Sequence, residues 1–102
     1  MSNPTLAVLV RFKSPLSLDE VRQVMNSRMD EFRALEGLKQ KYYLQDSVTG
    51  EYGGLYLWDS TGALAAYRES KLRETIAEAY RTEGEPRVEV FSVLDVLRDS
   101  TG

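Results

Sequence analysis

The chain contains neither cysteine nor histidine among its 102 residues. Without cysteine there is no disulfide, no thiolate nucleophile and no thiolate metal site. Without histidine the chain lacks the commonest general base, the commonest metal ligand and the usual proximal haem ligand. A zinc or non-haem iron centre would have to be built from carboxylates alone, which these metals rarely accept. We therefore expect no metal centre and no haem.

Long apolar segments and clusters of basic residues are also missing. The apolar run near the N-terminus, Leu6–Val10, is too short for the core of a signal peptide or for a membrane span. The net charge is −3 and the basic residues are scattered, so no surface is expected to attract nucleic acid or anionic lipid. We expect a cytoplasmic protein that binds neither membranes nor nucleic acid.

The length and the hydrophobic content of 42% predict one domain that spans residues 1–102. Thr5–Phe12 is almost entirely apolar, as is typical of a strand buried on both faces. Ser17 and Glu20 have the spacing of a capping box, and apolar residues at helical spacing follow until Gly37. This pattern predicts a strand followed by a long helix.

A second helical segment begins at Ser60, and its apolar pattern slips at Ser70, where a kink or a break is expected. Glu69 and Arg73 are spaced for an i,i+4 ion pair. The segment 87–94 predicts the last strand. Together with a hairpin in the middle of the chain, the order is β-α-β-β-α-β, which predicts an α+β, ferredoxin-like fold with a four-stranded antiparallel sheet.

The hairpin, Gly37–Asp59, is apolar on both faces. A turn at Thr49-Gly50 would place Val48 opposite Glu51, and the alternation of strand side chains then sorts the residues into two sets. One face carries Leu38, Tyr42, Leu44, Leu55 and Leu57. The opposite face carries Lys41, Tyr43, Gln45, Gly54, Tyr56 and Trp58.

In this topology both helices cover the same face of the sheet, which leaves the other face bare. A bare apolar face of that size exceeds what soluble monomers usually expose. Two such sheets stacked at a spacing of about 10 Å would bury each other. We therefore expect a homodimer through facing sheets.

Several residues of the hairpin are candidates for a ligand site. Tyr56 and Trp58, with Lys41 and Tyr43 on the same face, would line a slot suited to a planar ring. The alternative is that both aromatic residues are simply large side chains of the core. If Lys41 is desolvated, its pKa falls and its amine can make or hold a phenolate. If instead its stem is buried and its ammonium group reaches water, it has no such role.

Two candidates lie outside the hairpin. Tyr67, on the inner stripe of the second helix, either closes the slot above Trp58 or packs in the core. Arg11, near the end of the first strand, either neutralises a substrate anion or pairs with an acidic residue.

One set of residues is similar to the YdhR-type monooxygenase family, in the dimeric α/β-barrel superfamily that includes the antibiotic-biosynthesis monooxygenases. The resemblance spans nearly the whole chain and is carried by Gly37-Leu38, Lys41, Gly53-Gly54, Tyr56 and Trp58, followed by Ala63-Leu64 and Tyr67. It implies a homodimeric α/β barrel with a cavity between sheet and helices in each protomer.

The resemblance also implies an oxygenase that needs neither metal nor flavin. Such an enzyme deprotonates a small polyphenol or quinol-like substrate, and the resulting anion reacts with O2 directly. Tyr67 or Arg68 stands where several relatives have a histidine that the haem-degrading branch needs, so haem degradation is excluded.

Three functions remain open: a cofactor-independent monooxygenase, a non-catalytic dimer that binds a small molecule, and an interaction module with a filled core. For the first, the expected catalytic residues are Lys41 and Tyr56. The expected substrate-binding residues are Tyr43, Trp58, Tyr67 and Arg11.

Overall fold

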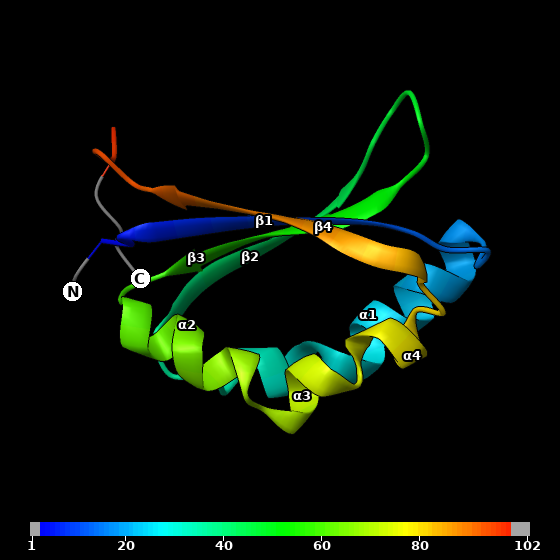
Figure 1. The fold of residues 1–102 in the computed structure, drawn as a ribbon, viewed down its shortest axis with the longest axis horizontal. Helices are drawn as coiled ribbons and strands as arrows, with labels where there is room; N and C mark the ends of the chain where they lie inside the picture. Colours follow the sequence, from blue (N-terminus) through cyan, green and yellow to red (C-terminus); the bar gives the residue numbers. More distant parts are fainter. Residues whose placement is uncertain (1–2, 99–102) are drawn as a thin grey trace.

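A computed structural model describes residues 3–98. The strands are β1 (Leu6–Lys13), β2 (Leu38–Gln45), β3 (Tyr52–Trp58) and β4 (Glu83–Ser92). The helices are α1 (Leu18–Arg33), α2 (Thr61–Arg68), α3 (Lys71–Glu74) and α4 (Ile76–Ala79). The strands pair antiparallel in the order β2-β3-β1-β4, and all helices lie on one side of the sheet (Figure 1). The predicted ferredoxin-like fold is confirmed. None of the helices within residues 3–98 is long and apolar enough to cross a membrane.

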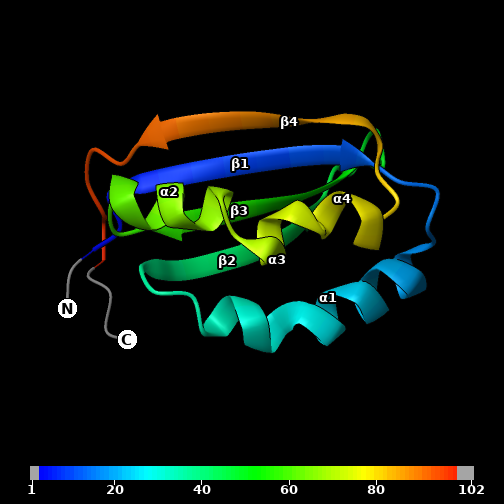
Figure 2. The same ribbon diagram turned by 60° about the horizontal axis from the view of Figure 1, so that its bottom comes forward.

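The predicted helix boundaries depend on serine caps, and the structure contains them. The Ser17 hydroxyl accepts a hydrogen bond from the Glu20 backbone N–H at 3.2 Å, and the Glu20 carboxylate accepts one from the Ser17 N–H at 2.9 Å. Ser70 interrupts the second helical segment, because its hydroxyl donates to the Tyr67 carbonyl at 2.6 Å and accepts from the Arg73 N–H at 3.2 Å. The segment therefore divides at Ser70 into α2 and α3, and α4 follows after Thr75; these short helices cover the same face of the sheet as α1 (Figure 2).

The tip of the β2–β3 hairpin differs from its prediction. Gln45 lies opposite Tyr52, whereas the predicted pairing would have placed it opposite Gly54. The Asp46 carboxylate accepts hydrogen bonds from the backbone N–H groups of Val48 at 2.8 Å and Thr49 at 3.0 Å, which closes a wider turn. The predicted register is therefore wrong by two residues. Because strand side chains alternate with a period of two, this error moves no residue between faces.

Leu38 is the exception, and its predicted place on the outer face is wrong. The pairing shifts between Leu38 and Gln40, so that Leu38 lies opposite Trp58 and packs against the core beneath the helices. Such a β-bulge adds one residue to one strand and reverses the face of the side chains beyond it.

The core lies between the sheet and the helices and is largely aromatic. Trp58 is only 1% exposed, and its ring stacks parallel to that of Tyr56 with centroids 6.5 Å apart. The Tyr67 ring approaches Trp58 to 5.2 Å and Tyr56 to 5.8 Å. Aromatic pairs in such geometries contribute about 0.5–1.5 kcal/mol each beyond the burial of their area. They join β3 to α2.

Within residues 3–98 no helix covers the opposite face of the sheet (Figure 1). Tyr42 and Phe91 are each 50% exposed there and Leu44 is 42% exposed. The register places Leu9 and Leu55 opposite each other on the same face. This outer face thus joins apolar side chains from all four strands.

A glycine comparison tests how closely α2 packs on the end of the hairpin. Gly37 and Gly50 both have positive φ, at 82° and 78°. A Cβ at Gly37 would lie 2.3 Å from the Ala63 Cβ, whereas one at Gly50 meets nothing within 4 Å. Urea denaturation should show Gly50→Ala losing about 1 kcal/mol of unfolding free energy from backbone strain. Gly37→Ala should lose about 1–3 kcal/mol more because of the clash. Equal losses would contradict this packing.

Candidate functional site

A cavity of about 670 Å³ opens between the sheet and the helices. This volume lies within the range of sites for small organic ligands. All four strands contribute to one wall, and α1 faces α2, α3 and α4 across the opening. The lining is mainly apolar and aromatic. The arrangement therefore suits a small ligand with a ring.

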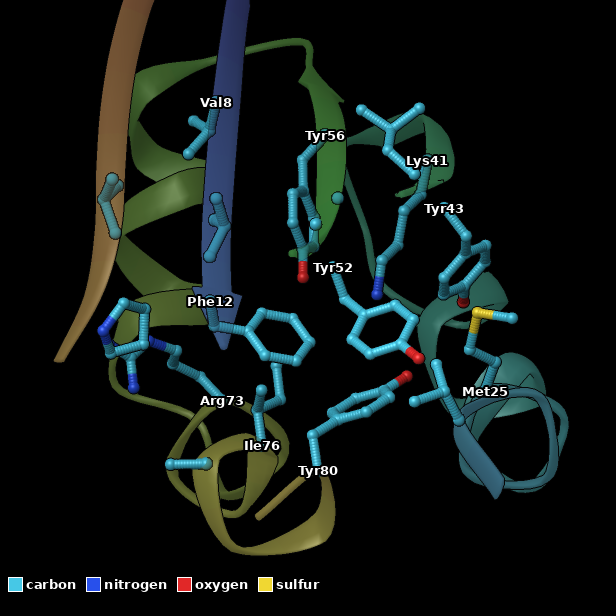
Figure 3. Close-up of a pocket in the computed structure, with 18 of the residues that line it drawn as sticks. Val8, Phe12, Met25, Lys41, Tyr43, Tyr52, Tyr56, Arg73, Ile76 and Tyr80 are labelled. Carbon is cyan, nitrogen blue, oxygen red and sulfur yellow. The ribbon is translucent and has the colours of Figure 1, made fainter. Parts of the chain in front are cut away.

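Five of the six tyrosines in the chain line this cavity: Tyr43, Tyr52, Tyr56, Tyr67 and Tyr80. Figure 3 shows the hydroxyl of Tyr56 and the amine of Lys41 pointing into the same space, with Tyr52 and Tyr80 approaching from below. The Tyr52 hydroxyl donates a hydrogen bond to the Leu16 carbonyl at 3.2 Å, which anchors that ring. The cavity thus presents phenol hydroxyls around one amine.

The amine of Lys41 lies among three aromatic rings. Its Nζ atom is 3.4 Å from the Phe32 ring centroid, 4.5 Å from that of Tyr43 and 4.6 Å from that of Tyr56. Gly54 leaves room for this arrangement, because a Cβ there would be 3.0 Å from the Tyr56 ring and 3.5 Å from the Lys41 stem. Ring faces favour the ammonium form. No carboxylate lies among the residues that line the cavity in the described part of the chain.

Burial acts against that ammonium form. Burial, and to a smaller extent the charge of Arg28, together lower the pKa of Lys41 from 10.5 to about 7. A lysine with a pKa near 7 is partly neutral at physiological pH, so it can accept a proton.

The pKa values of the tyrosines shift in the opposite direction, upward. Burial raises the pKa of Tyr56 well above 10, and its interaction with Tyr67 raises this pKa further. Burial also raises the pKa of Tyr67, and it raises that of Tyr80 to about 12. These phenols remain protonated near neutral pH and act as hydrogen-bond donors. Among the groups of the described lining, the amine of Lys41 is therefore the one whose pKa suits it to accept a proton near neutral pH.

Four of the six predicted site residues line the cavity: Lys41, Tyr43, Tyr56 and Tyr67. Trp58 does not. It is buried behind Tyr56 and Tyr67, and its indole Nε1 has no hydrogen-bond partner. Arg11 lies on the outer face of the sheet, where its Nη1 pairs with the Asp46 carboxylate at 2.9 Å. A ligand in the cavity would not contact Arg11, so the structure favours the pairing alternative for this residue.

Sequence reasoning missed two tyrosines of the cavity, Tyr52 and Tyr80. Tyr52 follows the period-two pattern of Tyr56 and Trp58, so extending the helix-facing set by one step would have included it. Tyr80 continues the helical spacing from Ile76, but the predicted helix gave no indication that its end reaches the cavity.

Metal ligands are scarce in this region. Within residues 3–98 no three or more acidic side chains are grouped so that they could hold a metal ion. The lining of the cavity offers amine, guanidinium and phenol groups instead.

The fold and the cavity define a ferredoxin-like protein with an aromatic chamber built around one partly buried lysine. The chain belongs to the family described as "Putative mono-oxygenase ydhR", whose model matches residues 6–100. The predicted family is therefore confirmed. No curated protein shows a significant sequence match to the chain.

Solved structures share the fold at low sequence identity. The cofactor-independent oxygenase SnoaB from Streptomyces nogalater is 15% identical with a TM-score of 0.74, over 94% of this chain and 99% of that one. A protein from Caulobacter crescentus, titled a putative antibiotic biosynthesis monooxygenase, is 17% identical with a TM-score of 0.76, over 91% and 92% of the chains. A dimeric ferredoxin-like protein of unknown function from Thermobifida fusca is 13% identical with a TM-score of 0.71, over 91% and 94%.

The depressed pKa of Lys41 has a consequence for stability. In the folded protein this pKa is about 7, whereas in the unfolded chain it is near 10.5. Between these values the unfolded chain binds more protons, so the Lys41 contribution makes the unfolding free energy rise with pH. Urea denaturation from about pH 7 to about pH 10 should show wild type gaining stability relative to Lys41→Met. The control Lys71→Met alters an exposed lysine outside the cavity and keeps Lys41, so wild type should gain no stability relative to this control over the same pH range. Parallel pH profiles for wild type and Lys41→Met would contradict the lowered pKa.

Proposed function

We propose that the protein is a cytoplasmic, cofactor-independent monooxygenase that oxidises a small aromatic, polyphenol- or quinol-like substrate with O2. The observation that carries this proposal is the partly buried amine of Lys41, with a pKa of about 7, inside an aromatic cavity. Membership of a mono-oxygenase family supports it. So does the fold shared with SnoaB, whose title describes a cofactor-independent oxygenase.

In the proposed reaction the neutral amine of Lys41 removes a proton from the substrate. The resulting ammonium group stays beside the substrate anion and stabilises it in a medium of low polarity. The anion supplies the electrons that reduce O2. One oxygen atom forms a bond to the substrate carbon, which changes from CH2 to C=O in an anthrone, or from a ring C–H to C=O when a phenol becomes a quinone. The other oxygen atom leaves as water, which takes up the proton that Lys41 had removed. No external reductant is needed.

Tyr56 would donate a hydrogen bond to the developing oxyanion, because its raised pKa keeps the phenol protonated. Tyr43 and Tyr67 would hold the substrate ring by contact with their own rings. The mainly apolar lining excludes water and orients the ring. The donor set supports metal independence, since the chain has no histidine or cysteine and the described lining of the cavity has no carboxylate.

A non-catalytic small-molecule-binding dimer is the second candidate. It is favoured by the three rings around the Lys41 amine, which stabilise the ammonium form and oppose a role as base. In that function the same cavity would hold an aromatic anion against the ammonium group without oxidising it.

We further propose that the protein is a homodimer through facing sheets. The apolar outer face needs a cover, and the similar protein from Thermobifida fusca is described as dimeric. A second copy of the same face would supply that cover.

Oxygen consumption separates the enzyme from the binding protein. With a panel of anthrones and hydroxylated naphthoquinones, wild type should consume O2 equally with and without chelator. Its kcat/KM should rise with pH through about 7, because the neutral amine is the active form. Lys41→Gln should lose about 10²–10⁴-fold in rate, the usual contribution of a general base. The control Tyr42→Phe, on the outer face, should retain the wild-type rate. Binding of several compounds without oxygen uptake would favour the second candidate.

The oligomeric state tests the proposed interface. Light scattering at micromolar concentration should give twice the chain mass of 11.6 kDa for wild type. Leu55→Glu places a charge at the centre of the outer face and should give the monomer mass. Val48→Glu, at the 91% exposed tip of the hairpin, should leave the dimer intact. A monomeric wild type would refute the facing-sheet dimer.

A further inference from the structure

The cavity carries a charge asymmetry that the oxygenase proposal does not use. Arg22, Arg68 and Arg73 line it in addition to Lys41, and the described lining contains no acidic residue. The whole chain has more acidic than basic residues, 16 against 13. A cavity with four basic residues and no acid therefore reverses the charge balance of the protein.

The three arginines belong to the mouth of the cavity, because each lines it while being exposed to solvent. Arg22 comes from α1 on one side of the opening, whereas Arg68 and Arg73 come from α2 and α3 on the other. Arg73 and Lys41 lie on opposite sides of the space into which Tyr56 points (Figure 3). The cavity thus has one cation among its rings and further cations at its rim.

These rim arginines have no acidic partners. Within residues 3–98 the ion pairs are Arg11–Asp46 and Arg33–Asp30. A continuous helix would have brought Glu69 next to Arg73, but the Ser70 cap breaks the helix between them, and the predicted pair is not formed. The break therefore leaves the guanidinium group of Arg73 available to a ligand.

The positive charge reaches the interior of the cavity. The pKa of Tyr67 is raised by burial, and the charges of Arg73 and Arg28 act on the same hydroxyl to lower it. An anion placed between Arg73 and Tyr67 would meet the same attraction. Guanidinium groups bind carboxylates with paired, charge-assisted hydrogen bonds.

We infer that the ligand of this cavity is an aromatic carboxylic acid, whose ring lies among the tyrosines and whose carboxylate is held at the mouth by Arg68 and Arg73. This inference deepens the proposed function, since it names the substrate class for the same cavity. The ring hydroxyl faces Lys41, and the carboxylate points the opposite way, toward the rim. Arg68 and Arg73 determine specificity and take no part in proton transfer.

Anaerobic titration calorimetry tests this inference separately from oxygenation. The probe is a hydroxynaphthoic acid with its hydroxyl and carboxyl groups on opposite rings, and the comparison is its methyl ester. Wild type should bind the acid about tenfold or more tightly than the ester, the lower end expected for hydrogen bonds to a charged group. The double variant Arg68→Gln/Arg73→Gln should bind acid and ester equally, with the affinity for the ester unchanged.

The matched control is Lys71→Gln, which removes a positive charge from the same short helix as Arg73 but outside the cavity lining. It should preserve the preference for the acid. Equal binding of acid and ester by wild type would overturn the inference, as would no binding of the acid. A preference that survives in the double variant, or that Lys71→Gln removes as well, would also overturn it. Binding without O2 uptake would support the inference and refute only the oxygenase.

Discussion

The conflict between burial and charge at Lys41 is the interaction on which the site depends. Its amine lies 3.4 Å from the Phe32 ring centroid, and no acidic side chain of the described cavity lining compensates its charge. Unpaired burial of a lysine is costly, and the usual response is a lower pKa. The same desolvation that costs stability brings the amine into the range where it exchanges protons at neutral pH. The desolvation of Lys41 thus lowers the stability of the fold and, at the same time, allows its amine to exchange a proton near neutral pH.

The position of Lys41 in the sheet explains why its side chain is partly removed from water. In β3, buried residues alternate with half-buried ones from Tyr52 to Trp58, so a single strand supplies the floor of the cavity and part of the outer face. Lys41 lies opposite Tyr56 on the helix-facing side of the sheet. Its stem crosses Gly54, where any side chain would crowd the Tyr56 ring. Residues that are close in the hairpin therefore build the part of the cavity around Lys41, whereas residues of the helices complete its mouth.

Much of this arrangement could be predicted from the sequence, since strand alternation depends only on local spacing. The face shared by Lys41, Tyr43 and Tyr56 was correct even though the turn was misplaced, because an error of two residues preserves alternation. The predicted face of Leu38 was wrong because a β-bulge adds one residue to β2 between Leu38 and Gln40. No residue type in this strand indicates the bulge. The sequence left two roles open for Arg11, and the choice between them depended on its ion pair with Asp46, 35 residues away in the chain. The unpaired state of Arg73 depended on the hydrogen bonds of Ser70, which only the structure shows.

The proposed reaction requires that Lys41 makes a substrate anion and that this anion reacts with O2 without a cofactor. Its most direct test is mass spectrometry of the product formed under ¹⁸O2 by metal-depleted protein, with the panel of anthrones and hydroxylated naphthoquinones. We expect one ¹⁸O atom in each product molecule for wild type, and about 10²–10⁴-fold less enzymatic product from Lys41→Gln in the same time. Product oxygen that derives from water, or an equal amount of ¹⁸O-labelled product from the Lys41→Gln variant, would contradict the proposed reaction.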